Sequence, residues 1–441
     1  MKRVTVLLLL GLSVSWAQEQ FDGHNALSYV EELCRPEYAG RKTGLPGARQ
    51  AALWIGERFK SWGLEPGGDK QSFIQEFPML VTDQKKRAQL KLLDGAFGSV
   101  NYQEGVDFVV YFNSGSGNIS SQVIFVGYGI SEPEKGWDDY AGLDVTGKIV
   151  LLYRGTPQDG GDWSFANERF YKVRTAAQKG AAALLILERG DWPVRGVTVN
   201  GEGYQPTMPL ISISKKAARD LFIGTHKHID LVIRDLEKKP QSFAMSKKVS
   251  LSVDMRPHAS QSGENVVGIW RGSDPLLQNE YIVLGGHMDH NGISPDGHLY
   301  AGADDNASGT AVVMELARVF AGRPRPKRSL VFIGFGGEEQ GLLGSWYYAH
   351  HPTVPAENMV AMFNFDMEGA GNGGASVSGR NYFMNPVDAV YGAYPDSILQ
   401  KFSMRRGSGM AGSDHSFFVQ QGIPAYYFFS TGDHPFYHQF E

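Results

Sequence analysis

The stretch Tyr281-Ile-Val-Leu-Gly-Gly-His287-Met-Asp289 is an apolar run that ends in a histidine and an aspartate. A helix is expected next, at about 307–320, and a second apolar run follows at 329–334. Strands that alternate with helices favour a mainly parallel sheet covered by helices on both faces. The sequence therefore predicts an α/β fold in which functional side chains gather outside the carboxyl ends of the strands.

The later strands end in side chains of the same kind. The run at 329–334 leads to Glu338 and Glu339, the run at 360–365 to Asp366, and the run at 425–429 to a loop with Asp433, His434 and His438. Carboxylates at one sheet edge repel one another unless a cation neutralises them, and mixed histidine and carboxylate sets suit a divalent metal such as zinc. Asp304 and Asp305 add two carboxylates before the helix at 307–320, although Asp305 alone could simply cap that helix.

Composition narrows the class of protein. The 441 residues include 42 Lys+Arg and 47 Asp+Glu, which gives a net charge of −5 and no basic surplus for binding phosphates. A nucleic-acid partner is therefore not expected. No Gly-x-Ser-x-Gly segment occurs in the chain, which removes the usual nucleophile of α/β-hydrolases.

The N-terminus has the pattern of a signal peptide. Lys2 and Arg3 precede an apolar run at 4–12, and Ser15 and Ala17 are small residues before an expected cleavage at Gln18. This run is far shorter than the roughly 20 residues that cross a bilayer. We expect residues 1–17 to be removed, the mature protein to be secreted or periplasmic, and no stable membrane insertion.

Six segments resemble, in order, the co-catalytic zinc exopeptidases, a family that includes bacterial leucine aminopeptidases and glutamate carboxypeptidase. They are 286–289, 302–309, 337–345, 364–367, 413–415 and 437–438. A further resemblance, to the protease-associated domain inserted in some members, is carried by 126–129, 144–150, 176–183 and 209–213. The peptidase domain is expected in two parts, 18–104 and 253–441, and the second part carries the metal site. The insert is expected at 105–252.

The resemblance implies two zinc ions per chain, with cobalt or manganese as alternatives. The implied ligands are His287 and Asp366 for one ion, Glu339 and His438 for the other, and Asp304 as the bridge. His434 is the alternative to His438. The family also implies a cis peptide bond after the bridging residue, which would be Asp304-Asp305.

The resemblance assigns two further residues to catalysis. Glu338 would be the general base, and Asp289 would orient His287 by accepting its other ring proton. In the implied reaction Glu338 takes a proton from a water that bridges the metals, the hydroxide attacks the scissile carbonyl, and Glu338 returns the proton to the leaving amine. The expected activity is aminopeptidase hydrolysis of N-terminal residues from peptides.

Other functions remain open at this point. A glutamate-carboxypeptidase-like enzyme is the first alternative, because the same insert occurs in both kinds of peptidase. A glutaminyl cyclase would use a single zinc, which does not suit five ligands. A non-catalytic binding protein on the same fold would be expected to lack ligands, and none is missing here.

Overall fold

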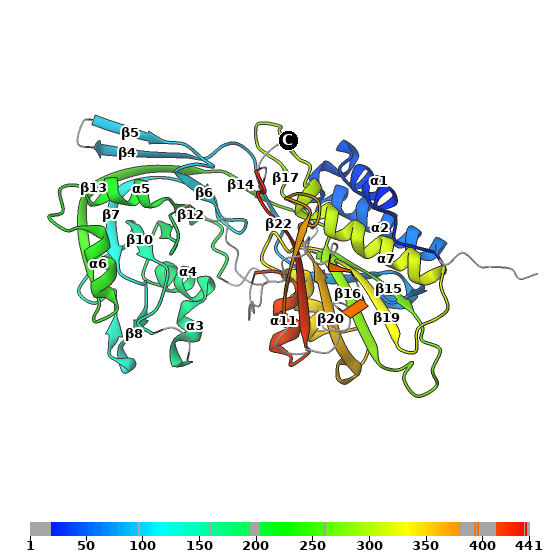
Figure 1. Ribbon diagram of the computed structural model, residues 1–441. Coiled ribbons are helices and arrows are strands. Elements are labelled where there is room, and N and C mark those ends of the chain that lie inside the picture. The colour runs from blue at the N-terminus through cyan, green and yellow to red at the C-terminus, as the bar shows by residue number, and fades with distance from the viewer. Residues whose placement is uncertain are drawn as a thin grey trace, which may run out of the picture.

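The chain folds around two eight-stranded sheets, one on each side of the molecule (Figure 1). The computed structural model describes residues 19–95, 98–158, 161–191, 193, 203–258, 262–379, 392–393, 395–396, 412–435 and 437–438. The predicted signal peptide lies outside these ranges. Within them, no helix combines the length and the apolar character needed to cross a membrane.

The first sheet contains strands from both ends of the chain. In spatial order they are β1 (Glu65–Pro66), β15 (Ser262–Trp270), β19 (Ser329–Phe335), β16 (Tyr281–His287), β20 (Met359–Phe365), β22 (Ala425–Thr431) and β21 (Gly374–Ser378), and β2 (Ile74–Pro78) also pairs with β15. Strands β19, β16, β20 and β22 are parallel, whereas β15 and β21 are antiparallel to their neighbours. The carboxyl ends of four strands therefore meet at one edge.

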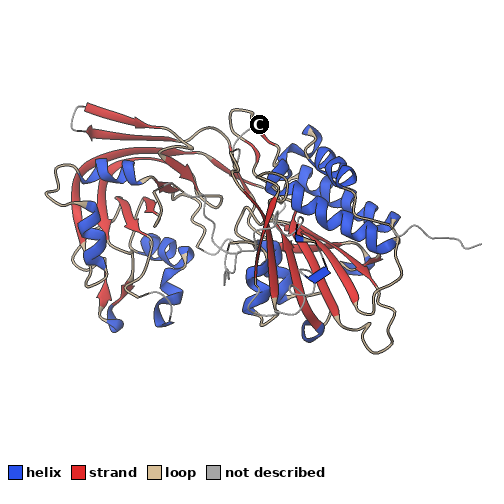
Figure 2. Cartoon of the chain, in the orientation of Figure 1, coloured by secondary structure: helices blue, strands red, loops and turns tan. Residues whose placement is uncertain are grey.

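Helices cover both faces of this sheet (Figures 1 and 2). One face carries α1 (Gly23–Leu33), α2 (Pro46–Ser61) and α7 (Gly309–Ala321), and the other carries α8 (Leu343–His350) and α11 (His415–Gln420). The rings of Tyr348 in α8 and Phe418 in α11 lie 6.4 and 6.0 Å from the ring of Phe335. All seven residues of β19 are buried, as a strand covered on both faces requires. The predicted α/β fold is thus confirmed.

The second sheet belongs to the middle of the chain. Its strands, in spatial order, are β5 (Gly98–Tyr102), β4 (Gln89–Gly95), β13 (Ser242–Val253), β7 (Gly117–Val126), β10 (Ile149–Tyr153), β11 (Ala183–Leu187), β12 (Leu210–Ile213) and β6 (Phe108–Val110). One face packs against α4 (Arg169–Gln178) and the other against α5 (Lys215–Phe222) and α6 (Ile229–Leu236). Because β4 and β5 belong to it, the sheet begins before the expected boundary at residue 105.

Short elements occur between these helices and strands. They are the 3₁₀ segments η1 (Pro36–Arg41), η2 (Asp69–Gln71), η3 (Pro133–Lys135), η4 (Gly161–Trp163) and η7 (Ala356–Asn358), the helix α3 (Ser164–Asn167), the irregular turn η6 (Ala303–Ser308), and the strand pairs β3 (Thr82–Gln84) with β14 (Met255–Pro257), β8 (Ser131–Glu132) with β9 (Trp137–Asp138) and β17 (Gly292–Ile293) with β18 (Leu299–Tyr300). The pair of β3 and β14 lies between the two sheets (Figure 1).

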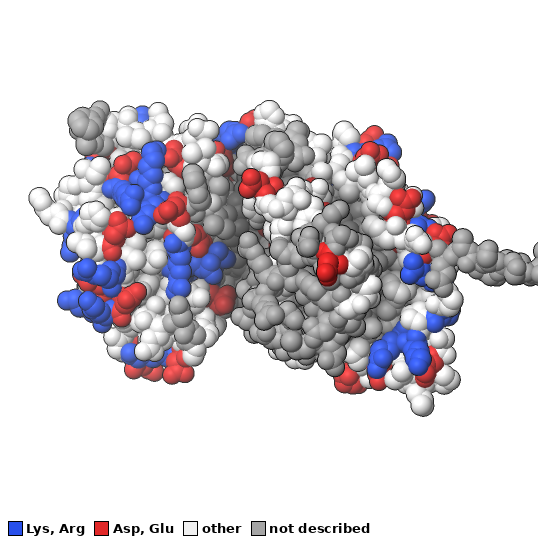
Figure 3. Space-filling model, viewed as in Figure 1, with Lys and Arg blue, Asp and Glu red and all other residues white. Residues whose placement is uncertain are grey.

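Charged side chains of both signs are intermixed on the visible face around the second sheet (Figure 3).

Candidate metal centre

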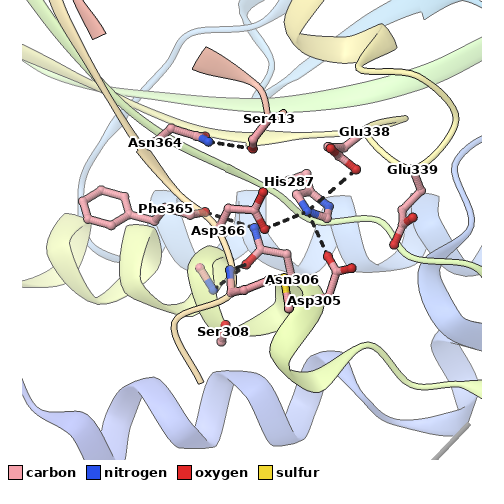
Figure 4. A network of polar contacts seen from close by, with 12 residues as sticks. His287, Asp305, Asn306, Ser308, Glu338, Glu339, Asn364, Phe365, Asp366 and Ser413 are labelled. Carbon is pink, nitrogen blue, oxygen red and sulfur yellow. Dashed lines mark hydrogen bonds and ion pairs between the residues drawn. The ribbon is translucent and has the colours of Figure 1, made fainter. Parts of the chain in front are cut away.

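The parallel strands of the first sheet deliver titratable side chains to one edge. His287 is the last residue of β16, Glu338 and Glu339 follow β19, and Asp366 directly follows β20. His438 lies in the loop beyond β22. Figure 4 shows the first four of these side chains converging from separate segments. Residues from distant parts of the chain thus meet because their strands end together.

Three carboxylates surround one ring nitrogen of His287. Nε2 lies 3.2 Å from Oδ1 of Asp305, 3.4 Å from Oδ1 of Asp366 and 4.0 Å from Oε2 of Glu338 (Figure 4). The imidazole is only 1% exposed. This first group therefore places one imidazole and three carboxylates in a nearly closed environment.

A second group forms around His438. Its Nε2 lies 3.0 Å from Oδ2 of Asp305 and 3.1 Å from Oε2 of Glu339. The other oxygen of Glu339 lies 2.5 Å from Nδ1 of His290. Asp305 consequently directs one carboxylate oxygen at His287 and the other at His438, and joins the two groups.

The structure places Asp305, and not Asp304, between the two histidines. Asp304 faces away: its Oδ1 accepts hydrogen bonds from the backbone amides of Gly369 and Ala370, both at 2.9 Å, and its Oδ2 lies 2.6 Å from His434. The backbone of η6 leaves helical geometry at Asp305, with φ −105° and ψ 96°, so the two neighbouring side chains diverge. The cis peptide bond also lies one residue later than expected. It joins Asp305 and Asn306, whereas the sequence analysis expected it between Asp304 and Asp305.

Asp289 contacts both His287 and the segment that carries Glu338. Its backbone carbonyl lies 3.2 Å from Nδ1 of His287, closer than its carboxylate Oδ1 at 3.6 Å. The same Oδ1 accepts a hydrogen bond from the backbone amide of Glu338 at 3.2 Å. With the proton on Nδ1, the lone pair of Nε2 faces the carboxylates, which is the orientation that a metal-binding histidine needs.

Two more histidines border the centre. His434, the alternative ligand in the sequence analysis, pairs with Asp304 and packs 4.8 Å from the ring of Phe429, so it lies outside both groups. His290 is not among the ligands that the family resemblance implies, yet its ring faces Glu339. Its position three residues after His287 in the same loop is the only sequence signal for it.

The spacing of these side chains suits zinc. Tetrahedral zinc with bonds of about 2.1 Å holds its ligand atoms about 3.4 Å apart. The four contacts of Asp305, Asp366 and Glu339 with His287 and His438 are 3.0–3.4 Å. The donors are imidazole and carboxylate, which zinc accepts. The side chains present therefore fit a metal pair that shares Asp305.

The two adjacent glutamates have opposite electrostatic environments. Burial raises the pKa of Glu338 well above its ordinary value, and repulsion by Glu339 and Asp366 adds to this effect against the attraction of His287. Burial would also raise the pKa of Glu339, but His438 and His290 hold it well below its ordinary value. Neighbouring carboxyl groups with divergent pKa values are typical of sites that assign them different tasks.

An open cavity of about 420 Å³ lies above the first group. His287, Asp305, Glu338 and Asp366 are among its lining residues. The remaining described lining includes the apolar or aromatic side chains Met367, Tyr427, Phe429 and Tyr437. A ligand in this cavity would contact the carboxylates with one end and the aromatic rings with the other.

Comparison with known proteins agrees with this architecture. Residues 265–441 match the model of peptidase family M28, and residues 108–221, within the expected insert, match that of the PA domain. Aminopeptidase YwaD of Bacillus subtilis is 28% identical over 227 residues, which cover 51% of this chain and 40% of YwaD. The chain spans less than two thirds of the length of this and other curated relatives.

Solved structures share the fold. The aminopeptidase from Aneurinibacillus sp. strain AM-1 superposes with a TM-score of 0.65 at 25% identity, covering 95% of this chain and 87% of that one. BSAP, a zinc aminopeptidase from Bacillus subtilis, superposes with a TM-score of 0.56 at 22% identity, covering 93% and 85%. The fold and the two matching family models thus indicate a peptidase-like domain with an inserted PA domain. More narrowly, the part of the chain that carries the candidate centre, residues 265–441, matches peptidase family M28.

Proposed function

We propose that the protein is an aminopeptidase with two zinc ions, and that Asp305 bridges them. The observation that carries this proposal is the position of the Asp305 carboxylate, whose oxygens lie 3.2 and 3.0 Å from His287 and His438. His287 and Asp366 would complete one zinc site, and Glu339 and His438 the other. Zinc bound there would supply Lewis-acid activation of a water molecule and of the scissile carbonyl group.

Glu338 is the residue we assign to proton transfer. Its Oε2 lies 4.0 Å from His287, farther than Asp305 or Asp366, and it lines the open cavity. Its backbone amide is held by Asp289, which fixes the start of the side chain. From this position Glu338 takes a proton from the attacking water and returns it to the leaving amine.

The names of relatives favour a free N-terminus as the reacting end of the substrate. YwaD and the Aneurinibacillus enzyme both carry the name aminopeptidase. A glutamate-carboxypeptidase-like activity is the alternative.

Peptides with blocked ends test the proposal. The full chain is incubated with an unblocked peptide, its N-acetylated copy and its C-amidated copy, with and without a chelator, and the products are read by mass spectrometry. The expected result is chelator-sensitive loss of residues from the N-terminus of the first and third peptides only. Loss from the C-terminus, absent in the amidated copy, would favour the alternative. The Glu338→Gln variant controls for contaminating peptidases.

We also propose that the protein is exported after removal of residues 1–17. The charged start, the apolar run at 4–12 and the small residues before Gln18 support this proposal. N-terminal sequencing of protein from the culture medium or periplasm is expected to begin at Gln18. A first residue of Met1 in that fraction would contradict it.

A further inference from the structure

Arg41 lies beneath the candidate metal centre, at the end of η1. Its side chain is fully buried, at 0% exposure, and its backbone has a positive φ of 50°. Gly40 before it approaches β17 and β18 so closely that a Cβ atom would lie 2.4 Å from the carbonyl oxygen of Gly292 and 2.5 Å from that of Tyr300. The backbone here is thus pressed against the loop that follows His287.

The guanidinium of Arg41 donates hydrogen bonds to four backbone carbonyls. Nε donates to Met288 at 2.8 Å, Nη1 to Leu33 at 2.5 Å and to Ala301 at 2.8 Å, and Nη2 to Gly302 at 2.8 Å. Met288 lies between His287 and Asp289, and Ala301 and Gly302 directly precede η6, the turn with Asp305. One planar side chain therefore ties together two ligand-bearing loops from a position 247 residues away in the chain.

The next residues hold the third loop. Oγ1 of Thr43, which is 1% exposed, accepts a hydrogen bond from the backbone amide of Gly337 at 2.7 Å. The backbone carbonyl of Thr43 accepts one from Nε2 of Gln340 at 3.3 Å. These contacts flank Glu338 and Glu339 on both sides. The carbonyl of Arg41 also accepts a 3.4 Å hydrogen bond from the amide of His290.

The chemistry of this contact set favours arginine over other cations. The guanidinium has five N–H donors in a rigid fork, so it reaches carbonyls in several directions around the edge of its plane. Lysine would bring the same charge at a single point, and cannot span Met288 and Gly302 in the same way. Burying such a cation is costly unless its donors are satisfied, and the four carbonyls satisfy most of them.

We propose that the segment 41–43 is a positioning element for the metal centre: Arg41 sets the spacing of His287 and Asp305, and Thr43 sets the place of Glu338 and Glu339. This inference rests on the proposed two-zinc function. Residues that orient metal ligands typically change metal affinity or activity by about 10- to 100-fold when replaced. A purely structural role would instead lower the stability of the apoprotein and leave the zinc affinity of the folded molecules unchanged.

Two variants of the full chain separate these roles. Arg41→Lys keeps the charge and loses the fork, and Thr43→Val keeps the shape and loses the acceptor for Gly337. Zinc affinity is measured by chelator competition. The constants kcat and KM are measured at saturating zinc, and the melting temperature is measured on the apoprotein. Arg35→Lys is the matched control, because Arg35 is exposed and pairs with Glu32 and Glu37. Thr43→Ser retains a hydroxyl and tests for rescue.

The expected result is a 10- to 100-fold weaker zinc affinity in Arg41→Lys. In Thr43→Val we expect a kcat about 10-fold lower with little change in KM, restored in Thr43→Ser. Wild-type affinity and kcat in both variants would overturn the inference while leaving the two-zinc proposal intact. A wild-type protein that binds no zinc would overturn the proposed function first. If Arg41→Lys does not fold, Thr43→Val decides the outcome alone.

Discussion

Nδ1 of His434 lies 2.6 Å from Oδ2 of Asp304, and this pair ties the loop that carries His438 to the turn that carries Asp305. Asp304 also accepts hydrogen bonds from the amides of Gly369 and Ala370. The first of two adjacent aspartates thus holds loops together, and the second faces the two histidines of the candidate centre.

The two aspartates are expected to differ in metal binding. Asp305→Asn removes the charge shared by both groups and should lose at least one zinc per chain, with activity lowered by 100-fold or more. Asp304→Asn should keep both ions, because it leaves every contact of His287 and His438 in place. Zinc per chain, determined by plasma mass spectrometry on dialysed protein, distinguishes the two. Loss of zinc in Asp304→Asn with retention in Asp305→Asn would reverse the assignment.

Glu338→Gln tests the proton-transfer role. The amide has nearly the shape of the carboxylate but cannot accept the proton, so kcat should fall by about 10²- to 10⁴-fold while zinc content and melting temperature stay near wild type. Glu357→Gln, at an exposed position in η7, is the control. Turnover close to wild type in Glu338→Gln would remove Glu338 from the mechanism.

The aromatic wall of the cavity should set side-chain preference. Tyr427 and Phe429 line the cavity beside Met367, so large apolar N-terminal residues would bury the most surface there. In Phe429→Ala, kcat/KM for leucine and phenylalanine substrates should fall about 10-fold relative to the alanine substrate. An equal fall for all three substrates would show that Phe429 affects the site as a whole.

A buried lysine should make the stability of the domain that contains the second sheet depend on pH. Lys172 in α4 is fully buried and donates to the carbonyls of Tyr128 and Gly155 at 2.7 and 2.9 Å. Burial lowers its pKa to about 7, against the attraction of Asp139. The other charged groups that act on it are Arg154, Glu188 and Arg189.

The sign of this effect follows from proton binding. Between pH 7 and about 10 the unfolded chain holds the lysine proton and the folded chain does not, so stability rises with pH in this window. Lys172→Met should flatten the rise. Urea unfolding of the wild type and of Lys172→Met between pH 6.5 and 9.5 measures the free energy of unfolding at each pH. The same pH dependence in both proteins would contradict the prediction. Asp139, whose pKa is raised to about 6, is still partly protonated in the folded chain at pH 6.5, so it adds a small contribution of opposite sign at the lower end of this range.

Much of the first sheet could be predicted from the sequence. The apolar runs at 281–284 and 329–334 are parts of β16 and β19, and the helix expected at 307–320 is α7. These segments are fully buried strands or amphipathic helices, which have the clearest local signals. The antiparallel strand β13, by contrast, alternates buried and exposed residues and pairs with strands more than a hundred positions earlier. Local pattern does not identify such partners.

The sequence indicates most of the side chains that lie together at the candidate centre. His287, Glu339, Asp366 and His438 come together as expected, because strand order dictates where they meet. The choice between Asp304 and Asp305 depends on the backbone angles of η6, which spacing does not encode. The sequence contains no local signal for the role of Arg41, because that role depends on a hydrogen bond to a carbonyl 247 residues away in the chain.

Anomalous diffraction at the zinc edge, from crystals of the full chain loaded with zinc, tests the central claim most directly. Two peaks are predicted, one among His287, Asp305 and Asp366 and the other among Asp305, Glu339 and His438. A single peak, or a peak between Asp304 and His434, would contradict a two-zinc centre bridged by Asp305.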